Sequence, residues 1–304
     1  MLLFQMTSFK QLALIGPTAS GKTALAIALA HQNNANILSL DSLALYKEID
    51  IASAKPSLKE RGKIKHFGMD ELYPNQPFDV TTFIKLYQTA KAQSIVENKN
   101  LIIVGGTSFY LKSLLDGISP IPTISNESHQ ETKRHLSDIT KAHNMLYMLD
   151  KEYMSNIKPT DHYRVEKMLN LFFETGLTPS QYFSDNPPKP TIQEELPIYE
   201  IEVERELLRK RIEKRTLAML SMGLIDEVFF LEKTYTRQPN CMKSIGIKEV
   251  LAYFDGIYSK NEMRERISIH TAQLAKRQRT FNRSQFQKKL ILPLKELKLL
   301  LLKK

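Results

Sequence analysis

A phosphate-binding loop between an apolar strand and a helix constrains the fold of this 304-residue chain more than any other feature. Residues 12–15 are apolar and predict a buried strand, and the Ala/Leu-rich residues 24–30 predict a helix. The loop between them is Gly16-Pro17-Thr18-Ala19-Ser20-Gly21-Lys22-Thr23, the pattern G-x-x-x-x-G-K-T. In such a loop the backbone N–H groups and the start of the helix face an anion, the lysine adds a positive charge, and the threonine hydroxyl can bind Mg²⁺. The pattern predicts binding of a di- or triphosphate, and a chance Gly/Ser-rich turn is the alternative.

Strands and helices alternate over the first third of the chain. The further elements predicted there are strands at 36–40 and 101–104 and helices at 79–97 and 109–115. Short apolar strands separated by helices are typical of a parallel sheet covered on both faces, so we predict an α/β fold. Ligands of such sheets bind beyond the carboxyl ends of the strands. Gly16, Asp41 and the run Gly105-Gly106-Thr107 all stand at predicted strand ends.

The pattern changes near residue 116, where prolines and polar residues begin. Amphipathic helices are predicted at 126–141, 149–157 and 160–175, with no strand-like run among them. A proline-rich segment at 186–190 closes this part. We therefore predict a core domain made of 1–114 and 191–304, with a helical insertion domain at 115–190. The core is predicted to resume with a strand at 198–203, helices at 204–221, 223–233, 244–254 and 260–284, and a short strand at 290–292.

The positive charge of the chain is concentrated in its last third. Residues 201–304 carry 23 Lys and Arg against 12 Asp and Glu, whereas residues 1–200 carry 20 against 21. This asymmetry is typical of a face that binds a polyanion, although a generally basic surface would give the same count. Cys241 is the only cysteine, which predicts no disulfides and a cytoplasmic location. No apolar run reaches the roughly 18 residues of a membrane span, so no membrane association is expected.

Asp41 is the first catalytic candidate. We expect Asp41 at the end of the strand beside the strand of the phosphate-binding loop, where a carboxylate can accept a proton from a group that attacks the bound phosphate ester. The alternatives are that Asp41 caps the next helix or holds magnesium through water. The apolar strand 101–104 ends in Gly105-Gly106-Thr107, where an ATPase would place a magnesium-binding Asp. This ending favours a transferase over a motor ATPase, and the glycines also suit a tight turn between strand and helix.

Two basic segments follow the insertion. The first includes Arg205, Arg209, Lys210, Arg211, Lys214 and Arg215. An arginine placed over the loop would neutralise a leaving diphosphate, and we expect at most one or two of these six side chains to reach the site. The second segment, 271–283, contains Lys276 and Arg277, and residues 271–304 hold ten Lys and Arg against one acid. Such a helix suits contacts with RNA or DNA phosphates, with a solvated helix face as the alternative.

Taken together, these segments resemble the tRNA dimethylallyltransferase (tRNA isopentenyltransferase) family. The matching pieces, which extend over most of the chain, are GPTASGKT at 16–23, DSLALYKEIDIASAKP at 41–56, His66 to Asp70, GGTSFYLKSLLDGIS at 105–119, Asp161-x-x-Arg164, LRKRIEKRTLAMLSMGLIDEV at 208–228, SIGIKEVLAYFDG at 244–256 and TAQLAKRQRTFNR at 271–283. The loop alone is shared by many families, whereas this ordered series is specific.

The resemblance implies an activity, a fold and partners. The activity is transfer of a dimethylallyl group from dimethylallyl diphosphate to the exocyclic amine of adenine 37 of tRNA, with release of diphosphate and assistance from Mg²⁺. The fold is a nucleotide-kinase-like core with a helical insertion that grips the anticodon stem-loop, in agreement with the segmentation above. A monomer is expected. The adenine must be flipped out of the stacked loop to reach the allylic carbon.

The resemblance also implies roles for particular residues. Gly16 to Thr23 hold the diphosphate, with Lys22 and Thr23 counted among the catalytic residues and Thr23 as the magnesium ligand. Asp41 binds the adenine amine and acts as the general base, and Arg215 stabilises the leaving diphosphate. The residues expected to contact tRNA are Asp41, Ser42, Leu43, Ala44, Thr107, Tyr163, Arg164, Lys167, Lys243, Gly246, Lys248, Lys276 and Arg277.

The chain departs from the family pattern at positions assigned to tRNA binding. Ala272 stands where the family commonly has arginine, Ile247 replaces a tyrosine, and Lys243 replaces an arginine. In the insertion, Lys167 and Asn170 replace arginine and glutamate. Two other functions remain open from the residues alone. A small-molecule P-loop kinase accounts for the first 110 or so residues but not for the basic last third, and an RNA-binding ATPase lacks its second acidic residue.

Overall fold

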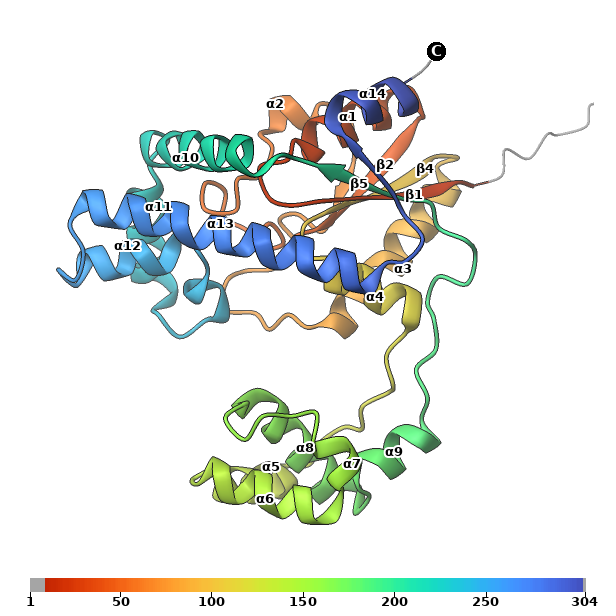
Figure 1. Ribbon diagram of the computed structural model, residues 1–304, viewed down its shortest axis with the longest axis vertical. Coiled ribbons are helices and arrows are strands. Elements are labelled where there is room, and N and C mark those ends of the chain that lie inside the picture. The colour runs from red at the N-terminus through yellow and green to blue at the C-terminus, as the bar shows by residue number, and fades with distance from the viewer. Residues whose placement is uncertain (1–8, 303–304) are drawn as a thin grey trace, which may run out of the picture. The chain divides into compact units, whose positions relative to one another are not determined.

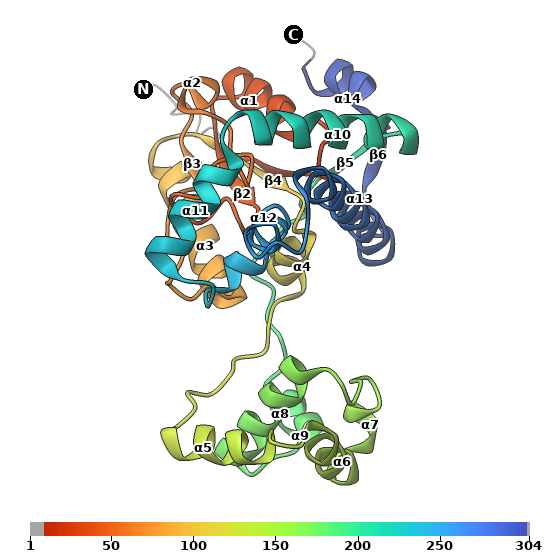
Figure 2. The same cartoon turned by 90° about the vertical axis from the view of Figure 1, so that its left-hand side faces the viewer.

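The computed structural model describes residues 9–302 and contains a six-stranded sheet whose pairings are all parallel. The strands are β1 (Gln11–Ile15), β2 (Ala35–Leu40), β3 (His66–Phe67), β4 (Asn100–Gly105), β5 (Ile198–Glu202) and β6 (Leu290–Pro293). Their order across the sheet is β3-β2-β4-β1-β5-β6, so β1 lies between β4 and β5 (Figures 1 and 2). This arrangement confirms the predicted α/β class. The expectation that the strand ending in Asp41 lies beside the strand of the phosphate-binding loop is wrong, because β4 lies between β2 and β1.

Helices cover both faces of the sheet, which explains why its strands are almost continuously apolar. The helices of this part are α1 (Lys22–Gln32), α2 (Leu58–Arg61), α3 (Val80–Val96), α10 (Arg205–Ser221), α11 (Leu224–Tyr235), α12 (Ile247–Phe254), α13 (Lys260–Gln285) and α14 (Leu294–Leu301), with a 3-10 helix η1 (Asn240–Lys243). Figures 1 and 2 show α1 and α14 on one side of the sheet and α3 on the other. Leu14, Ile37 and Ile102 pack with Leu25 and Leu29 of α1 in the main core. A second core joins α11, α12 and α13 to the loop after β2.

The chain divides into two compact units, of which the first is formed by Met1–Lys112 and Ile192–Lys304 and the second by Ser113–Thr191. Helix α4 (Ser108–Asp116) leads from one unit into the other. The second unit contains α5 (Asn126–His135), α6 (Ile139–Leu149), α7 (Lys151–Met154), α8 (His162–Thr175) and α9 (Pro179–Asp185). Its own core includes Leu146, Met154, Val165 and Leu169. No helix among residues 9–302 is long and apolar enough to cross a membrane.

Several predicted boundaries are wrong for identifiable reasons. The helix expected over 126–141 is two helices, because the side chain of Asp138 accepts a hydrogen bond from the Lys141 amide and caps a new helix there. The segment 149–157 forms only one helical turn, α7. The helix predicted over 244–254 is α12, which starts only at Ile247, after the 3-10 helix η1. Helices α2, α9 and α14 and the short strand β3 were not predicted.

Gly105 allows β4 to end close to β2, and this close approach gives a stability prediction. A Cβ at Gly105 would stand 2.4 Å from the carbonyl oxygen of Leu40, so backbone would have to move to admit it. We expect Gly105→Ala to lower the free energy of unfolding by about 1–3 kcal/mol or more, measured by urea denaturation. Gly256→Ala is the control, since a Cβ there meets nothing within 4 Å and costs only about 1 kcal/mol for its φ of +71°. Equal losses in the two variants would contradict this account.

Candidate active site

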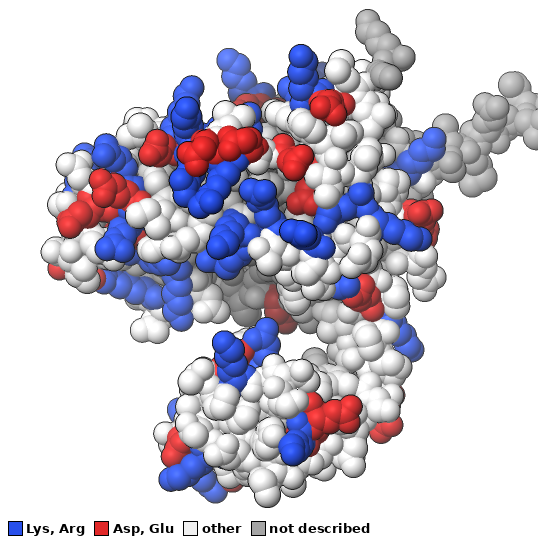
Figure 3. Space-filling model, in the orientation of Figure 1, with Lys and Arg blue, Asp and Glu red and all other residues white. Residues whose placement is uncertain are grey.

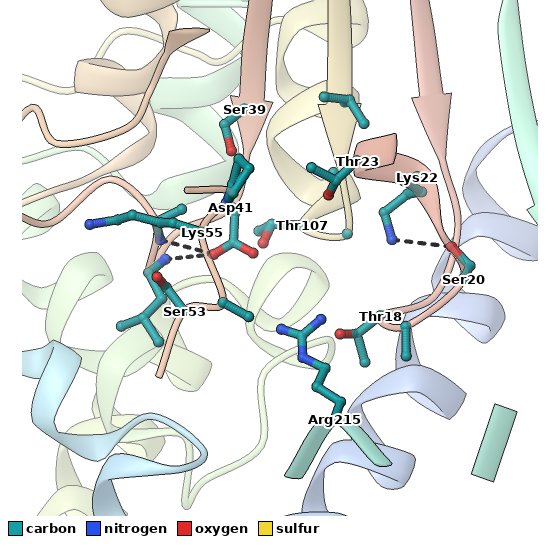
Figure 4. A pocket seen from close by; sticks show the side chains of 18 of the residues that line it. Thr18, Ser20, Lys22, Thr23, Ser39, Asp41, Ser53, Lys55, Thr107 and Arg215 are labelled. Atoms are coloured by element: carbon teal, nitrogen blue, oxygen red, sulfur yellow. Dashed lines mark hydrogen bonds between the residues drawn. The ribbon is translucent and has the colours of Figure 1, made fainter. Parts of the chain in front are cut away.

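A cavity of about 1140 Å³ lies beyond the carboxyl ends of β1, β2 and β4 (Figure 4). The residues that line it include Thr18 to Thr23 of the loop, Asp41 to Ala44 after β2, and Gly105 to Thr107 after β4. Helices α10 and α13, the loop after β2 and residues 244–245 contribute further walls. The three strand ends that the sequence placed together are therefore joined in one site.

The phosphate-binding loop holds the lysine side chain against its own backbone. Lys22 Nζ donates hydrogen bonds to the carbonyl oxygens of Gly16, at 2.9 Å, and of Pro17, at 2.6 Å. Burial lowers the pKa of Lys22 to about 7, and the nearby charge of Arg215 acts in the same direction, against the opposing effects of Asp41 and Glu200. An anion in this loop would stabilise the protonated ammonium, so diphosphate binding and the charge of Lys22 are coupled.

Asp41 divides its carboxylate between two tasks. Its Oδ1 accepts hydrogen bonds from the backbone amides of Leu43, at 2.9 Å, and Ala44, at 3.1 Å, which fixes the turn after β2. Within the described residues its Oδ2 accepts no hydrogen bond. Figure 4 shows this carboxylate, the hydroxyl of Thr107 and the guanidinium of Arg215 turned toward the same space. Asp41 therefore caps a turn and not a helix, as one alternative had it, and an oxygen remains available to the cavity.

Three basic side chains of α10 line the cavity, so the expectation that at most one or two of the six would reach it is wrong. Lys214 and Arg215 follow Arg211 by three and four residues, so all three lie on one face of the helix. Arg211 donates a hydrogen bond to the carbonyl of Ser20 at 3.4 Å. Burial lowers the pKa of Arg215 below its ordinary value, and Asp41 opposes this shift, so Arg215 is a poorly hydrated cation facing a carboxylate.

The residues assigned to tRNA do not all lie together. Ser42, Leu43, Ala44, Thr107 and Arg277 line the cavity, with Ser244 and Ile245 from the segment that contains the predicted Lys243, Gly246 and Lys248. Lys276 faces away from the cavity into a separate groove between α10 and α13, and Figure 3 shows basic side chains gathered over these two helices. Tyr163, Arg164 and Lys167 lie on α8 in the second unit, where Lys167 Nζ stands 5.7 Å from the centroid of the Tyr163 ring.

The loop after β2 is stabilised by an ionic cluster that the sequence did not reveal. The buried Lys55 lines the cavity and binds Asp50, at 2.8 Å, and Asp70, at 2.7 Å, and Arg61 binds Asp70 at 2.9 Å. Burial works against ionisation of Asp70, but the hydrogen bonds and charges of Lys55 and Arg61 outweigh it and lower the pKa of Asp70. The one sequence signal for Lys55 was its place, before Pro56, within the segment 41–56 that matches the family.

Comparisons with known proteins agree over nearly the whole chain. A model of the IPP transferase family matches residues 44–285. The tRNA dimethylallyltransferase of Sulfurovum sp. (strain NBC37-1) is 60% identical over 277 residues, which is 91% of this chain and 92% of that protein. The enzyme of the same name from Helicobacter pylori (strain J99) is 41% identical over 280 residues, or 92% of this chain and 89% of that protein.

Solved structures show the same fold. The tRNA isopentenylpyrophosphate transferase of Bacillus halodurans superposes with a TM-score of 0.68 at 26% identity and covers 94% of this chain and 90% of its own. A eukaryotic dimethylallyltransferase, described as acting on tRNA, gives a TM-score of 0.81 at 25% identity and covers 95% of this chain and 75% of its own. Together with the family match and the cavity described above, these similarities show that the chain belongs to the tRNA dimethylallyltransferase, or IPP transferase, family of enzymes.

Proposed function

We propose that this protein transfers a dimethylallyl group from dimethylallyl diphosphate to the N6 amine of adenosine 37 in tRNA and releases diphosphate. The observation that carries the proposal is one cavity in which a diphosphate-binding loop faces a carboxylate with an available oxygen, Oδ2 of Asp41. A cradle for the leaving group and an acceptor for the amine proton are the two parts that this substitution requires.

The residues divide the reaction between them. The loop amides from Ala19 to Thr23 and the ammonium of Lys22 bind the diphosphate, and Arg215 balances the charge that grows on it as the carbon–oxygen bond breaks. The adenine N6 forms the new bond to the allylic carbon, and Oδ2 of Asp41 accepts the proton that N6 loses. Thr107, whose amide donates to the carbonyl of Leu40 at 2.9 Å, is held at the end of β4 to contact the RNA near this base.

Magnesium fits the residues present. The hydroxyl of Thr23 is exposed at the first turn of α1 and lines the cavity. Within residues 9–302 no cluster of three or more acidic, His or Cys side chains could enclose a metal ion. Mg²⁺ is commonly held by one or two protein oxygens with substrate phosphates and water supplying the rest. Thr23 would hold such an ion, which would partly neutralise the bound diphosphate.

The tRNA is proposed to bind through its anticodon stem-loop, with adenosine 37 flipped into the cavity. The cost of unstacking this base, a few kcal/mol, would be offset by contacts to the RNA backbone. Basic residues at the cavity, such as Arg277, and the predicted residues of α8 and of segment 243–248 would supply these contacts. The enzyme is proposed to act as a monomer.

Transfer of radiolabel from dimethylallyl diphosphate to a tRNA transcript, followed by nucleoside mass spectrometry, tests the proposed reaction. We expect dimethylallyl adenosine at position 37 and no label in a transcript that carries another base there. Phosphate transfer from ATP to a small acceptor, without labelling of tRNA, would instead support the kinase alternative.

Arg277→Ala is expected to weaken tRNA binding without harming the diphosphate site. Among the described residues the Arg277 side chain makes no ion pair or hydrogen bond, and it lines the cavity mouth formed by α13. A phosphate contact of this kind contributes about one unit to the slope of log affinity against log salt concentration. Filter binding at several salt concentrations should show a shallower slope, and an unchanged slope and affinity would argue that Arg277 faces solvent in the complex.

A further inference from the structure

Gln278 joins the basic helix α13 to the phosphate-binding loop. Its side-chain Oε1 accepts a hydrogen bond from the backbone amide of Thr18 at 2.8 Å, although the two residues lie 260 positions apart in the chain. Gln278 also lines the cavity, on the same helix as Arg277. The contact therefore connects a helix suited to RNA phosphates with the loop suited to the diphosphate.

Gln278 and Lys22 form hydrogen bonds to the same peptide unit, the one between Pro17 and Thr18. The amide of Thr18 and the carbonyl of Pro17 belong to one planar group, so fixing the amide fixes the carbonyl. That carbonyl oxygen accepts from Lys22 Nζ at 2.6 Å and from the Ser20 amide at 3.3 Å. Gln278 thus sets the orientation of a peptide to which Lys22 and the next turn of the loop are bound.

Gly106 provides the space that this side chain needs. A Cβ at Gly106 would stand 2.3 Å from Nε2 and 3.1 Å from Cδ of Gln278, and the three nearest atoms all belong to this side chain. A side chain at position 106 would therefore push the Gln278 amide away from Thr18. Glycine is needed at positions 105 and 106 for different reasons. At Gly105 the missing side chain leaves space for the backbone of Leu40, and at Gly106 it leaves space for the Gln278 side chain.

We propose that Gln278 is a positioning residue for diphosphate binding, which orients the Pro17–Thr18 peptide and does so only because residue 106 is glycine. The inference rests on the proposed function, since the diphosphate that the loop holds is that of the allylic substrate. Gln278 acts through the loop and also packs against the residue before Thr107, so it ties the ends of β1 and β4 to α13.

The test is a double-mutant cycle between Gln278 and Gly106. Gln278→Met keeps the length and volume of the side chain but cannot accept from Thr18, and we expect the KM for dimethylallyl diphosphate to rise about 3- to 10-fold, the range for one lost hydrogen bond. A smaller change is expected in kcat and in the KM for tRNA. Gly106→Ala should produce a similar rise, because its methyl group displaces the same amide. In the double variant the KM for dimethylallyl diphosphate should rise no more than in the worse single variant, since both substitutions remove the same hydrogen bond.

Gln88→Met is the matched control, because Gln88 lies on α3, is exposed, lines neither the cavity nor the groove between α10 and α13, and makes no hydrogen bond among the described residues. It should leave both KM values and the melting temperature unchanged. The Gln278 and Gly106 effects must appear in variants whose thermal unfolding matches that of the wild type, which separates positioning from loss of folding. An unchanged KM in Gln278→Met, or effects that multiply in the double variant, would overturn the inference. Absence of prenyl transfer in the wild-type protein would instead refute the proposed function, and the cycle could then be measured by direct titration with inorganic diphosphate.

Discussion

Asp41→Asn is expected to lower kcat for prenyl transfer by about 10²- to 10⁴-fold, the usual contribution of a general base. Asparagine retains an Oδ1 that can accept from the amides of Leu43 and Ala44, so the turn after β2 is kept. The group that replaces Oδ2 is an amide nitrogen, which cannot accept the proton from N6. Single-turnover transfer of labelled dimethylallyl to tRNA would measure the loss directly.

Comparison with Asp41→Ala separates the two tasks of the carboxylate. Alanine removes the cap as well as the base, so it should lower the melting temperature, with a stability loss of about 0.5–2 kcal/mol typical of a lost cap. Asp41→Asn should keep the melting temperature of the wild type. Titration with dimethylallyl diphosphate should give a similar dissociation constant for Asp41→Asn and for wild type. Near-normal turnover in Asp41→Asn would show that Asp41 is only a cap and that the proton leaves by another route.

Arg215→Ala is expected to produce a second large loss, of about 10²- to 10³-fold in kcat. The Arg215 side chain is partly buried and lines the cavity beside the loop, where a positive charge stabilises a leaving diphosphate far more than it would in bulk solvent. Arg215→Lys should recover part of the activity, since it restores the charge but not the planar group of donors. The measurement is the rate of diphosphate release at saturating substrates.

Arg209→Ala provides the control on the same helix. Arg209 is exposed, pairs with Glu206 at 3.2 Å, and does not line the cavity. A surface pair of this kind contributes little, so turnover and stability should stay near wild type. If the two alanine variants reduced turnover equally, the effect would belong to the general charge of α10 rather than to a residue at the leaving group.

The sequence was sufficient for those features that depend on local pattern. The phosphate-binding loop is recognisable because its glycines, lysine and threonine have fixed spacing between a strand and a helix. The parallel sheet follows from fully apolar strands such as 101–104. Asp41 was placed at the correct edge because carboxyl ends of parallel strands share one edge, whereas the order of the strands, with β4 between β2 and β1, was not predicted. Helix ends were predicted less accurately, since a single capping residue such as Asp138 can divide a continuous amphipathic pattern into two helices.

Other features depend on contacts between distant segments, which no local pattern encodes. The bond from Gln278 to Thr18 and the pairing of Lys55 with Asp70 appear only when the chain is folded. The number of α10 side chains at the cavity depends on how that helix is rotated against the loop, because its basic residues surround much of its circumference. Helix α14 was missed because it follows a short strand near the end of the chain and has few residues to establish a period.

The position of β1 between β4 and β5 has a consequence for synthesis on the ribosome. When the first 112 residues have emerged, β1 can pair with β4, but its other edge stays bare until about 90 further residues supply β5. An exposed edge of apolar residues invites pairing with other chains. Nascent or truncated chains that stop within the helical unit should therefore need chaperone protection, and heterologous expression of such fragments should yield aggregates.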